Sequence, residues 1–193
     1  MQTAMTEFAT LFAGAAAAVP ADRLAAATPC ERFTVAELLE HIGGILADSE
    51  RAAARVPRGE ASSAAGSAPA EVAAGAERAA AAWLRPEAME GETEFGPGLM
   101  PSSLAAAVTL QELAIHGWDL ARATDRPYPV GEEAGAVLLG VVEQLAEQAR
   151  ATGGYGEPVA APDGASAFER ALALSGRDAR WGTDVPAVAA DAV

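Results

Sequence analysis

The segment 102–124 constrains the fold of this chain more than any other part of it. Its apolar side chains point in nearly every direction around a helix, at Leu104, Val108, Leu110, Leu113, Ile115 and Leu120. A helix that is apolar nearly all round needs other elements to cover it on most sides. We therefore predict a helix here, capped by Ser102 or Ser103, at the centre of a bundle of helices.

Other segments supply the helices that would surround this one. Thr34 followed by Glu37 is a capping box, and apolar residues at helical spacing follow it to about residue 56. The same spacing, with Pro and Gly at the boundaries, predicts helices at 6–19, 69–84, 132–150 and 168–174 and a short helical turn near Arg23. The stretch 58–67, rich in Gly, Ser and Ala, is predicted to be a mobile connection, and 87–101 to be irregular.

Composition agrees with an all-α fold. Hydrophobic residues make up 51% of the 193 residues but aromatic residues only 5%, which favours close-packed helices over a β-sandwich. We predict one domain over 1–193, with a four-helix bundle to about residue 152. A short irregular and helical C-terminal extension would follow at 153–193.

The charge of the chain limits its partners. The formal net charge is −14, whereas nucleic acids and anionic membranes select for clustered basic residues, so we expect neither as a partner. No stretch approaches about 18 uninterrupted apolar residues, and residues 1–19 lack the basic start of a signal peptide. The single cysteine, Cys30, excludes an internal disulfide and fits a reducing compartment. We expect a cytoplasmic protein with a small-molecule ligand, which could form a homodimer.

The two histidines indicate where chemistry could occur. Glu112 and His116 are four residues apart, so they share one face of the predicted central helix. A carboxylate in such apolar surroundings is costly unless it is paired or bound to a cation. His41, beside the apolar stripe of another helix, could approach the same point. Two imidazoles and one carboxylate suit zinc, nickel or iron(II) with open coordination positions.

Several alternatives remain at this point. Glu37 also precedes His41 by four residues, although the capping box already accounts for it. Asp119 could orient an imidazole from behind or form an ion pair with Arg122. Cys30 is best explained as a buried structural thiol, with a nucleophile or a fourth metal ligand as the alternatives.

Three sequence motifs together resemble a known family. They are residues 28–41, TPCERFTVAELLEH; residues 112–124, ELAIHGWDLARAT; and residues 176–181, GRDARW. In this order and spacing they are similar to the signatures of DinB/YfiT-like metal-binding proteins, the single-domain relatives of mycothiol-dependent maleylpyruvate isomerase. The resemblance implies a DinB-like four-helix bundle with a divalent metal held by His41, Glu112 and His116.

The resemblance also implies a direction for function. Relatives with an assigned role use low-molecular-weight thiols, so we expect a thiol-dependent, mycothiol-type transferase or isomerase acting on a small electrophile. The alternatives are a non-catalytic metal- or ligand-binding module and a hydrolase that activates water. Phe33 stands where the family usually has tryptophan. The second domain of maleylpyruvate isomerase is absent from this sequence, so we expect a different reaction.

Overall fold

A computed structural model describes residues 1–58 and 67–182 of the chain. The helices are α1 (Gln2–Ala17), α2 (Val35–Ala53), α3 (Pro69–Trp83), α4 (Ser102–Ala123), α5 (Glu132–Ala151) and α6 (Ala167–Leu174). Two short 3-10 helices and one hairpin connect them: η1 (Ala21–Arg23), η2 (Pro86–Met89), β1 (Glu92–Phe95) and β2 (Gly98–Pro101). The predicted mobile connection falls mostly on 59–66 and the end of the predicted extension on 183–193, both outside the described residues.

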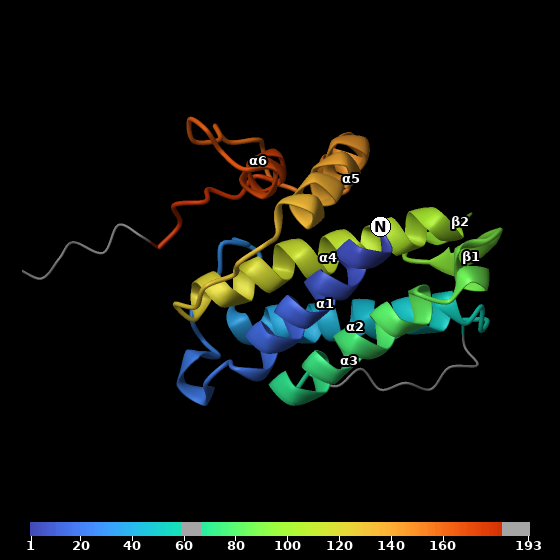
Figure 1. Ribbon diagram of the computed structural model, residues 1–193. Helices are drawn as coiled ribbons and strands as arrows, with labels where there is room; N and C mark the ends of the chain where they lie inside the picture. The colour runs from blue at the N-terminus through green and yellow to red at the C-terminus, as the bar shows by residue number, and fades with distance from the viewer. Residues whose placement is uncertain (59–66, 183–193) are drawn as a thin grey trace, which may run out of the picture.

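Helices α1 to α4 form the bundle (Figure 1). Helix α1 packs against α3 and α4, and α2 packs against the same two helices. The consecutive helices α1 and α2 therefore lie on a diagonal of the bundle. Because α2 and α4 are neighbours, side chains from these two helices can meet at one point, and the predicted all-α bundle is confirmed.

Helix α4 is buried along most of its surface, as its sequence predicts. Its buried residues include apolar side chains from Ala105 to Ala123 and polar ones such as Thr109, His116 and Asp119. It contacts α1, α2, α5 and the hairpin. Polar groups in such a position need partners inside the protein, because water does not reach them.

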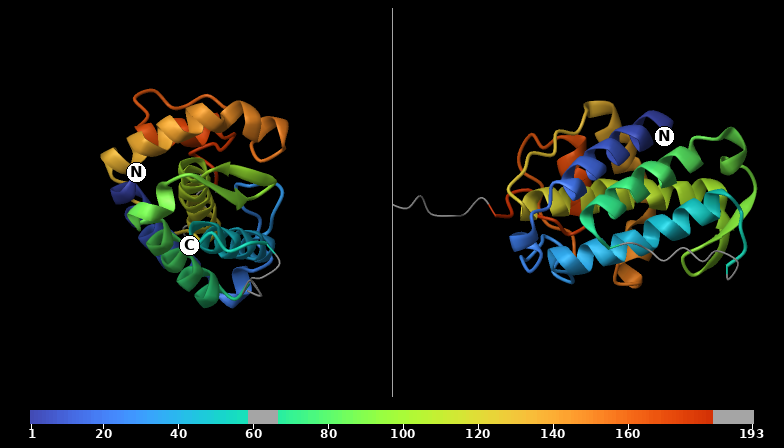
Figure 2. Two further views of the ribbon diagram at one scale, coloured as in Figure 1. Left: turned by 90° about the vertical axis from the view of Figure 1, so that its right-hand side faces the viewer. Right: turned by 90° about the horizontal axis from the view of Figure 1, so that it is seen from below.

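Helices α5 and α6 form a second layer, which we call the C-terminal layer together with the segments 152–166 and 175–182. Helix α5 packs chiefly against α6 and, less extensively, against α1 and α4. The end-on view in Figure 2 shows α5 lying across one side of the bundle. Arg150 links α5 to α6, because its Nη1 donates to the carbonyl oxygen of Leu174, the last residue of α6, at 3.1 Å. No helix in 1–58 or 67–182 has the length and apolarity needed to cross a membrane.

Three local predictions were wrong. Helix α1 begins at Gln2, four residues before the predicted start, because Ala4 and Met5 are already buried against the bundle. No serine side chain caps α4: its N-cap is Pro101, and the Ser102 N–H donates to the Gly91 carbonyl at 2.9 Å. The hairpin fixes the start of this helix instead.

The third error concerns residues 87–101, which contain a β-hairpin rather than only irregular chain. Strands β1 and β2 are antiparallel, with Phe95 opposite Gly98. Thr93 and Phe95 face the protein while their neighbours are exposed, and Gly96 adopts a positive φ of 55° in the turn. The period-two pattern covers only one short strand, so it is too short to be distinctive in the sequence.

Candidate metal centre

The candidate site lies where α2 faces α4. His41 is in the second turn of α2, whose start is fixed by the predicted capping box between Thr34 and Glu37. Glu112 and His116 lie one turn apart in the middle of α4. Glu37 uses its carboxylate to cap its own helix, accepting from the Thr34 N–H at 2.8 Å. This contact removes Glu37 as the rival partner of His41.

The structure brings His41, Glu112 and His116 together. Glu112 Oε2 is 3.3 Å from His116 Nε2 and 3.8 Å from His41 Nε2. One donor atom from each of the three residues lies within 4.8 Å of the other two. Ligand atoms around a tetrahedral zinc ion with bonds of about 2.1 Å are about 3.4 Å apart. The spacing therefore suits such an ion, with His41 slightly outside the other pair.

The donor set fits a cation. Asp119 Oδ2 lies 2.9 Å from His116 Nδ1, so a neutral ring would donate its N–H there and turn the lone pair of Nε2 toward Glu112. Glu112 Oε2 is buried and makes no hydrogen bond of normal geometry. Lone pairs from two side chains thus face each other, an arrangement that is favourable only with a proton or a metal ion between them.

The pKa shifts of Glu112 and His116 in the metal-free site also indicate that the site needs a positive charge. Burial opposes ionisation of Glu112, but its contacts with His116 and His41 outweigh burial and hold the pKa of Glu112 well below its usual value. Burial likewise opposes a charge on His116. The bonds to Asp119 and Glu112 outweigh it and raise the pKa of His116 to about 9. Without a metal, a proton on His116 therefore supplies the positive charge.

The ring of His41 is held by the loop that precedes α2. Phe33 stacks on it with 4.8 Å between ring centroids and 22° between planes. The Arg32 guanidinium lies 5.3 Å from the centroid of the Phe33 ring. The loop is fixed by the Thr28 hydroxyl, which is 2.8 Å from the carbonyl oxygen of Phe33. Phe33, the departure from the usual tryptophan, therefore supports His41 by stacking.

A second cluster of polar side chains lies on the Nδ1 side of the His116 ring. The sequence predicted only some of its contacts. Asp119 is fully buried. The sequence predicted an imidazole or Arg122 as its partner, and the structure shows the contact with the imidazole of His116. Arg122 instead donates to the carbonyl oxygen of Trp181. The further partner of Asp119 is Arg177, whose Nη2 donates to Oδ2 at 3.2 Å. The sequence carries no spacing signal for this contact, because the two residues lie in different layers.

Cys30 belongs to this second group and not to the first. Donor atoms of Cys30, His116 and Asp119 lie within 4.8 Å of one another. Burial raises the pKa of the Cys30 thiol, although Arg177 acts in the opposite direction. Because Arg177 already compensates Asp119, this group lacks the excess negative charge that would attract a metal ion. Cys30 is therefore best explained as a buried structural thiol.

Tyr155, which the sequence analysis did not single out, approaches α4 from the C-terminal layer. Its hydroxyl donates to Gln111 Oε1 at 2.7 Å. Burial and the Glu112 charge both raise the pKa of Tyr155, so its hydroxyl stays protonated. Arg32 adds a contact between the bundle and the same loop, because its Nη1 donates to the Gly153 carbonyl at 2.6 Å.

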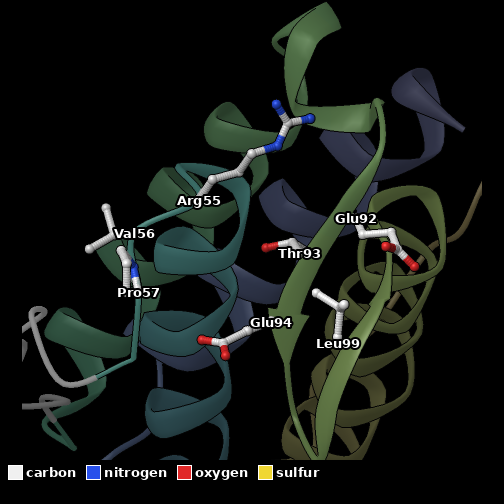
Figure 3. A pocket seen from close by; sticks show the side chains of 7 residues that line it. All are labelled: Arg55, Val56, Pro57, Glu92, Thr93, Glu94 and Leu99. Atoms are coloured by element: carbon white, nitrogen blue, oxygen red, sulfur yellow. The ribbon is translucent and has the colours of Figure 1, made fainter.

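A separate surface hollow of about 270 Å³ lies beside the hairpin (Figure 3). Residues just after α2 and residues of both strands line it: Arg55, Val56, Pro57, Glu92, Thr93, Glu94 and Leu99. None of the three candidate ligands lines it. The hollow is therefore not part of the candidate metal centre.

Comparison with known protein families gives one match, to the mycothiol maleylpyruvate isomerase N-terminal domain, over residues 5–121. The match covers more than half of the chain and includes most of α1, all of α2 and α3, and most of α4. No curated protein and no solved structure matches the chain. The matched segment contains His41, Glu112 and His116, whereas Arg177 and Tyr155 lie beyond it. The chain thus belongs to the family of the mycothiol maleylpyruvate isomerase N-terminal domain, which is DinB-like, mycothiol-related and metal-binding.

Proposed function

We propose that this protein binds a divalent metal ion through His41, Glu112 and His116 and uses it in thiol chemistry. Zinc is the first candidate because two imidazoles and a carboxylate are a common zinc donor set, with nickel and iron(II) as alternatives. The co-substrate would be a low-molecular-weight thiol of the mycothiol type and the second substrate a small electrophile. The reaction would be a transfer or an isomerisation.

One observation carries the metal proposal. The buried Glu112 Oε2 has no hydrogen bond of normal geometry and faces the Nε2 atoms of both histidines. With both rings neutral, this carboxylate would be buried beside two nitrogen lone pairs, which is expensive in folding free energy unless a proton or a metal ion lies between them. Such an arrangement is expected where a cation provides the compensation.

The exposure of the three side chains indicates where a substrate would approach. The His41 side chain is 33% exposed and that of Glu112 18%, whereas that of His116 is only 9% exposed. A substrate would therefore approach the site from the side of His41. A cation bound there lowers the pKa of a coordinated thiol and so favours its nucleophilic thiolate.

The protein's own residues would keep the ligands in place for this chemistry. Asp119 accepts the Nδ1–H of His116 and thereby directs Nε2 toward Glu112. Phe33 limits rotation of the His41 ring by stacking on it. Tyr155 stays protonated, and its hydroxyl donates to Gln111 on α4, so it acts as a structural contact rather than a base.

Metal content is the first test. The protein is purified without a His tag, and metal is measured by elemental analysis in the parent and in Glu112→Gln and His116→Ala variants. Glu40→Gln serves as the control, because Glu40 precedes His41 but is exposed. We expect about one metal ion per chain in the parent and the control, and loss in both ligand variants. A parent that neither contains zinc nor binds added zinc contradicts the proposal.

The thiol is tested separately with the metal-loaded protein. A panel of small electrophiles is assayed with and without mycothiol or a simpler thiol, and the His116→Ala variant is the background control. Thiol-dependent product formation supports the transferase or isomerase. Equal turnover without thiol would instead indicate activation of water. Metal binding without turnover across the panel would indicate a binding module.

A further inference from the structure

The C-terminal layer contributes a buried cation close to the candidate metal centre. Arg177 follows α6 and is only 5% exposed. Its Nη1 donates to the Ser175 carbonyl at 3.0 Å and its Nη2 to Asp119 Oδ2 at 3.2 Å. Arg177 lies outside the segment 5–121 that matches the family. It connects the C-terminal layer to α4 at the level of the candidate site.

The same carboxylate oxygen serves both neighbours. Asp119 Oδ2 receives the Arg177 Nη2 and lies 2.9 Å from His116 Nδ1. His116 Nε2, on the other side of the ring, is 3.3 Å from Glu112 Oε2. A continuous series of polar contacts therefore runs from the C-terminal layer through Asp119 and His116 to the candidate metal ligands.

Asp119 links Arg177 to His116 only while its Oδ2 atom stays in place to accept both hydrogen bonds. It is fully buried, and a buried carboxylate without a cationic partner is strongly destabilised. Arg177 supplies this partner, and its Nη2 contacts the same oxygen, Oδ2, as the imidazole. Loss of Arg177 would favour movement of Asp119, and this movement would release the ring of His116.

We propose that Arg177 is a positioning residue of the metal centre, which fixes the orientation of His116 through Asp119. The C-terminal layer would thus complete a site whose three ligands all belong to the bundle. This inference rests on the proposed metal-binding function. It adds a residue of the 176–181 motif, which lies outside the matched segment 5–121, and makes metal affinity depend on how the two layers are docked.

A purely structural role for Arg177 predicts a different outcome, and Arg150 allows the two roles to be separated. Arg150 also holds the C-terminal layer together, through the Leu174 carbonyl, but this hydrogen bond does not involve Asp119. A change at Arg150 should therefore loosen the layer without acting on the imidazole. Arg150→Gln is the matched control for Arg177→Gln.

The experiment measures the affinity of the full-length protein for Co(II), by its visible absorption, and for zinc, by competition with a chelator. The proteins are the parent, Arg177→Gln, Asp119→Asn, the double variant and Arg150→Gln. The double variant replaces the buried ion pair by two neutral amides of similar size, so it leaves no uncompensated charge. Circular dichroism melts report whether each protein is folded.

If Arg177 acts through Asp119, Arg177→Gln weakens metal binding by about tenfold and alters the Co(II) spectrum. Asp119→Asn weakens it by about ten- to hundredfold. The double variant then binds no more than about threefold more weakly than Asp119→Asn, because the two changes interrupt one series of contacts. Arg150→Gln binds within about threefold of the parent. If Arg177→Gln does not fold, Arg177→Lys keeps the charge and is expected to weaken binding by at least about threefold.

Three results would overturn the inference. The first is an Arg177 variant that binds cobalt as tightly as the parent or more tightly. The second is a double variant whose loss of metal affinity is the product of the two single losses, and the third is a loss of metal affinity in Arg150→Gln equal to that in Arg177→Gln. In each case the parent still binds metal, so the proposed function survives. A parent that binds neither cobalt nor zinc instead refutes the proposed function, and this inference with it.

Discussion

Gly117, the residue after His116, is constrained by an aromatic ring. Tyr128 packs against α4 at this point, and its hydroxyl donates to the Leu113 carbonyl at 3.2 Å. A Cβ atom added at Gly117 would lie 2.9 Å from Tyr128 Cζ, which is too close for normal packing. The glycine of the sequence motif is therefore explained by packing of a neighbouring segment onto α4, next to a candidate ligand.

We predict that Gly117→Ala lowers the free energy of unfolding by about 1–3 kcal/mol, because displacement of Tyr128 outweighs the better helix propensity of alanine. Gly140→Ala in α5 is the matched control. A Cβ at Gly140 meets nothing within 4 Å, so this change should stabilise the protein by about 0.5–1 kcal/mol. Urea unfolding monitored by circular dichroism measures both values. Equal effects at the two positions would contradict the packing explanation.

Ser49 is a second residue whose role can be tested. It accepts a hydrogen bond from Trp83 Nε1 at 2.8 Å, and its hydroxyl lies 2.7 Å from Thr109 Oγ1 inside the bundle. Ser49→Ala should lower the free energy of unfolding by about 1–3 kcal/mol, because the indole N–H is left without an acceptor. The exposed Thr10 is the control: Thr10→Ala should change stability by no more than about 0.5 kcal/mol. Denaturant melts that show similar effects for both would refute the role assigned to Ser49.

The ligand candidates and the buried ion pair differ in how far the sequence could predict them. The proximity of Glu112 and His116 follows from helix geometry, and that of His41 follows from the family signatures. The pairing of Asp119 with Arg177 could not be predicted in the same way. It depends on how the C-terminal layer docks on α4, which is a packing outcome without a local spacing pattern.

At the scale of helices and strands, the predicted elements are those with local signals. The predicted capping box at the start of α2 forms, and Pro69 occupies the first turn of α3. Helix α6 also begins with a capping box, between Ser166 and Glu169. The start of α1 has no side-chain cap, and the start of α4 is set by the hairpin. These boundaries depend on tertiary contacts, so sequence patterns alone gave wrong positions.

The capping box of α2 gives a pH-dependent prediction. The Thr34 N–H and then the Thr34 hydroxyl donate to Glu37 and lower its pKa below the ordinary value of 4.5. The charge on Glu37 therefore adds stability above the unfolded-state pKa, and this addition is lost as the pH falls through the lower folded-state pKa. Glu37→Gln should be less stable than the parent near neutral pH.

The difference should shrink as the pH falls and vanish once Glu37 is protonated in both states. Urea unfolding across the acid range measures it, with the exposed Glu40→Gln on the same helix as control. A difference between parent and Glu37→Gln that stays constant down to about pH 2 would contradict the assignment.

For the whole molecule, metal binding should appear as stabilisation, because the ligands come together only in the folded bundle. Free zinc at about 100 times its dissociation constant should raise the free energy of unfolding by about 2.7 kcal/mol. For a chain of this length the melting temperature would rise by roughly 5–10 °C. Thermal melts with zinc and then with excess chelator measure the change. His116→Ala should show no zinc-dependent shift, and an equal shift in this variant would indicate binding elsewhere.

The diagonal placement of α1 and α2 also has a consequence for the time course of folding. Within the described residues, α1 packs most extensively against α3 and α4, and α2 packs against α4 as well as against α3. The contacts of α1, and those between α2 and α4, therefore join segments that are far apart in the chain, and such contacts slow folding relative to bundles in which only successive helices pair. The metal ligands of α2 and α4 would be among the groups assembled late. Metal capture during refolding would then mark one of its final events.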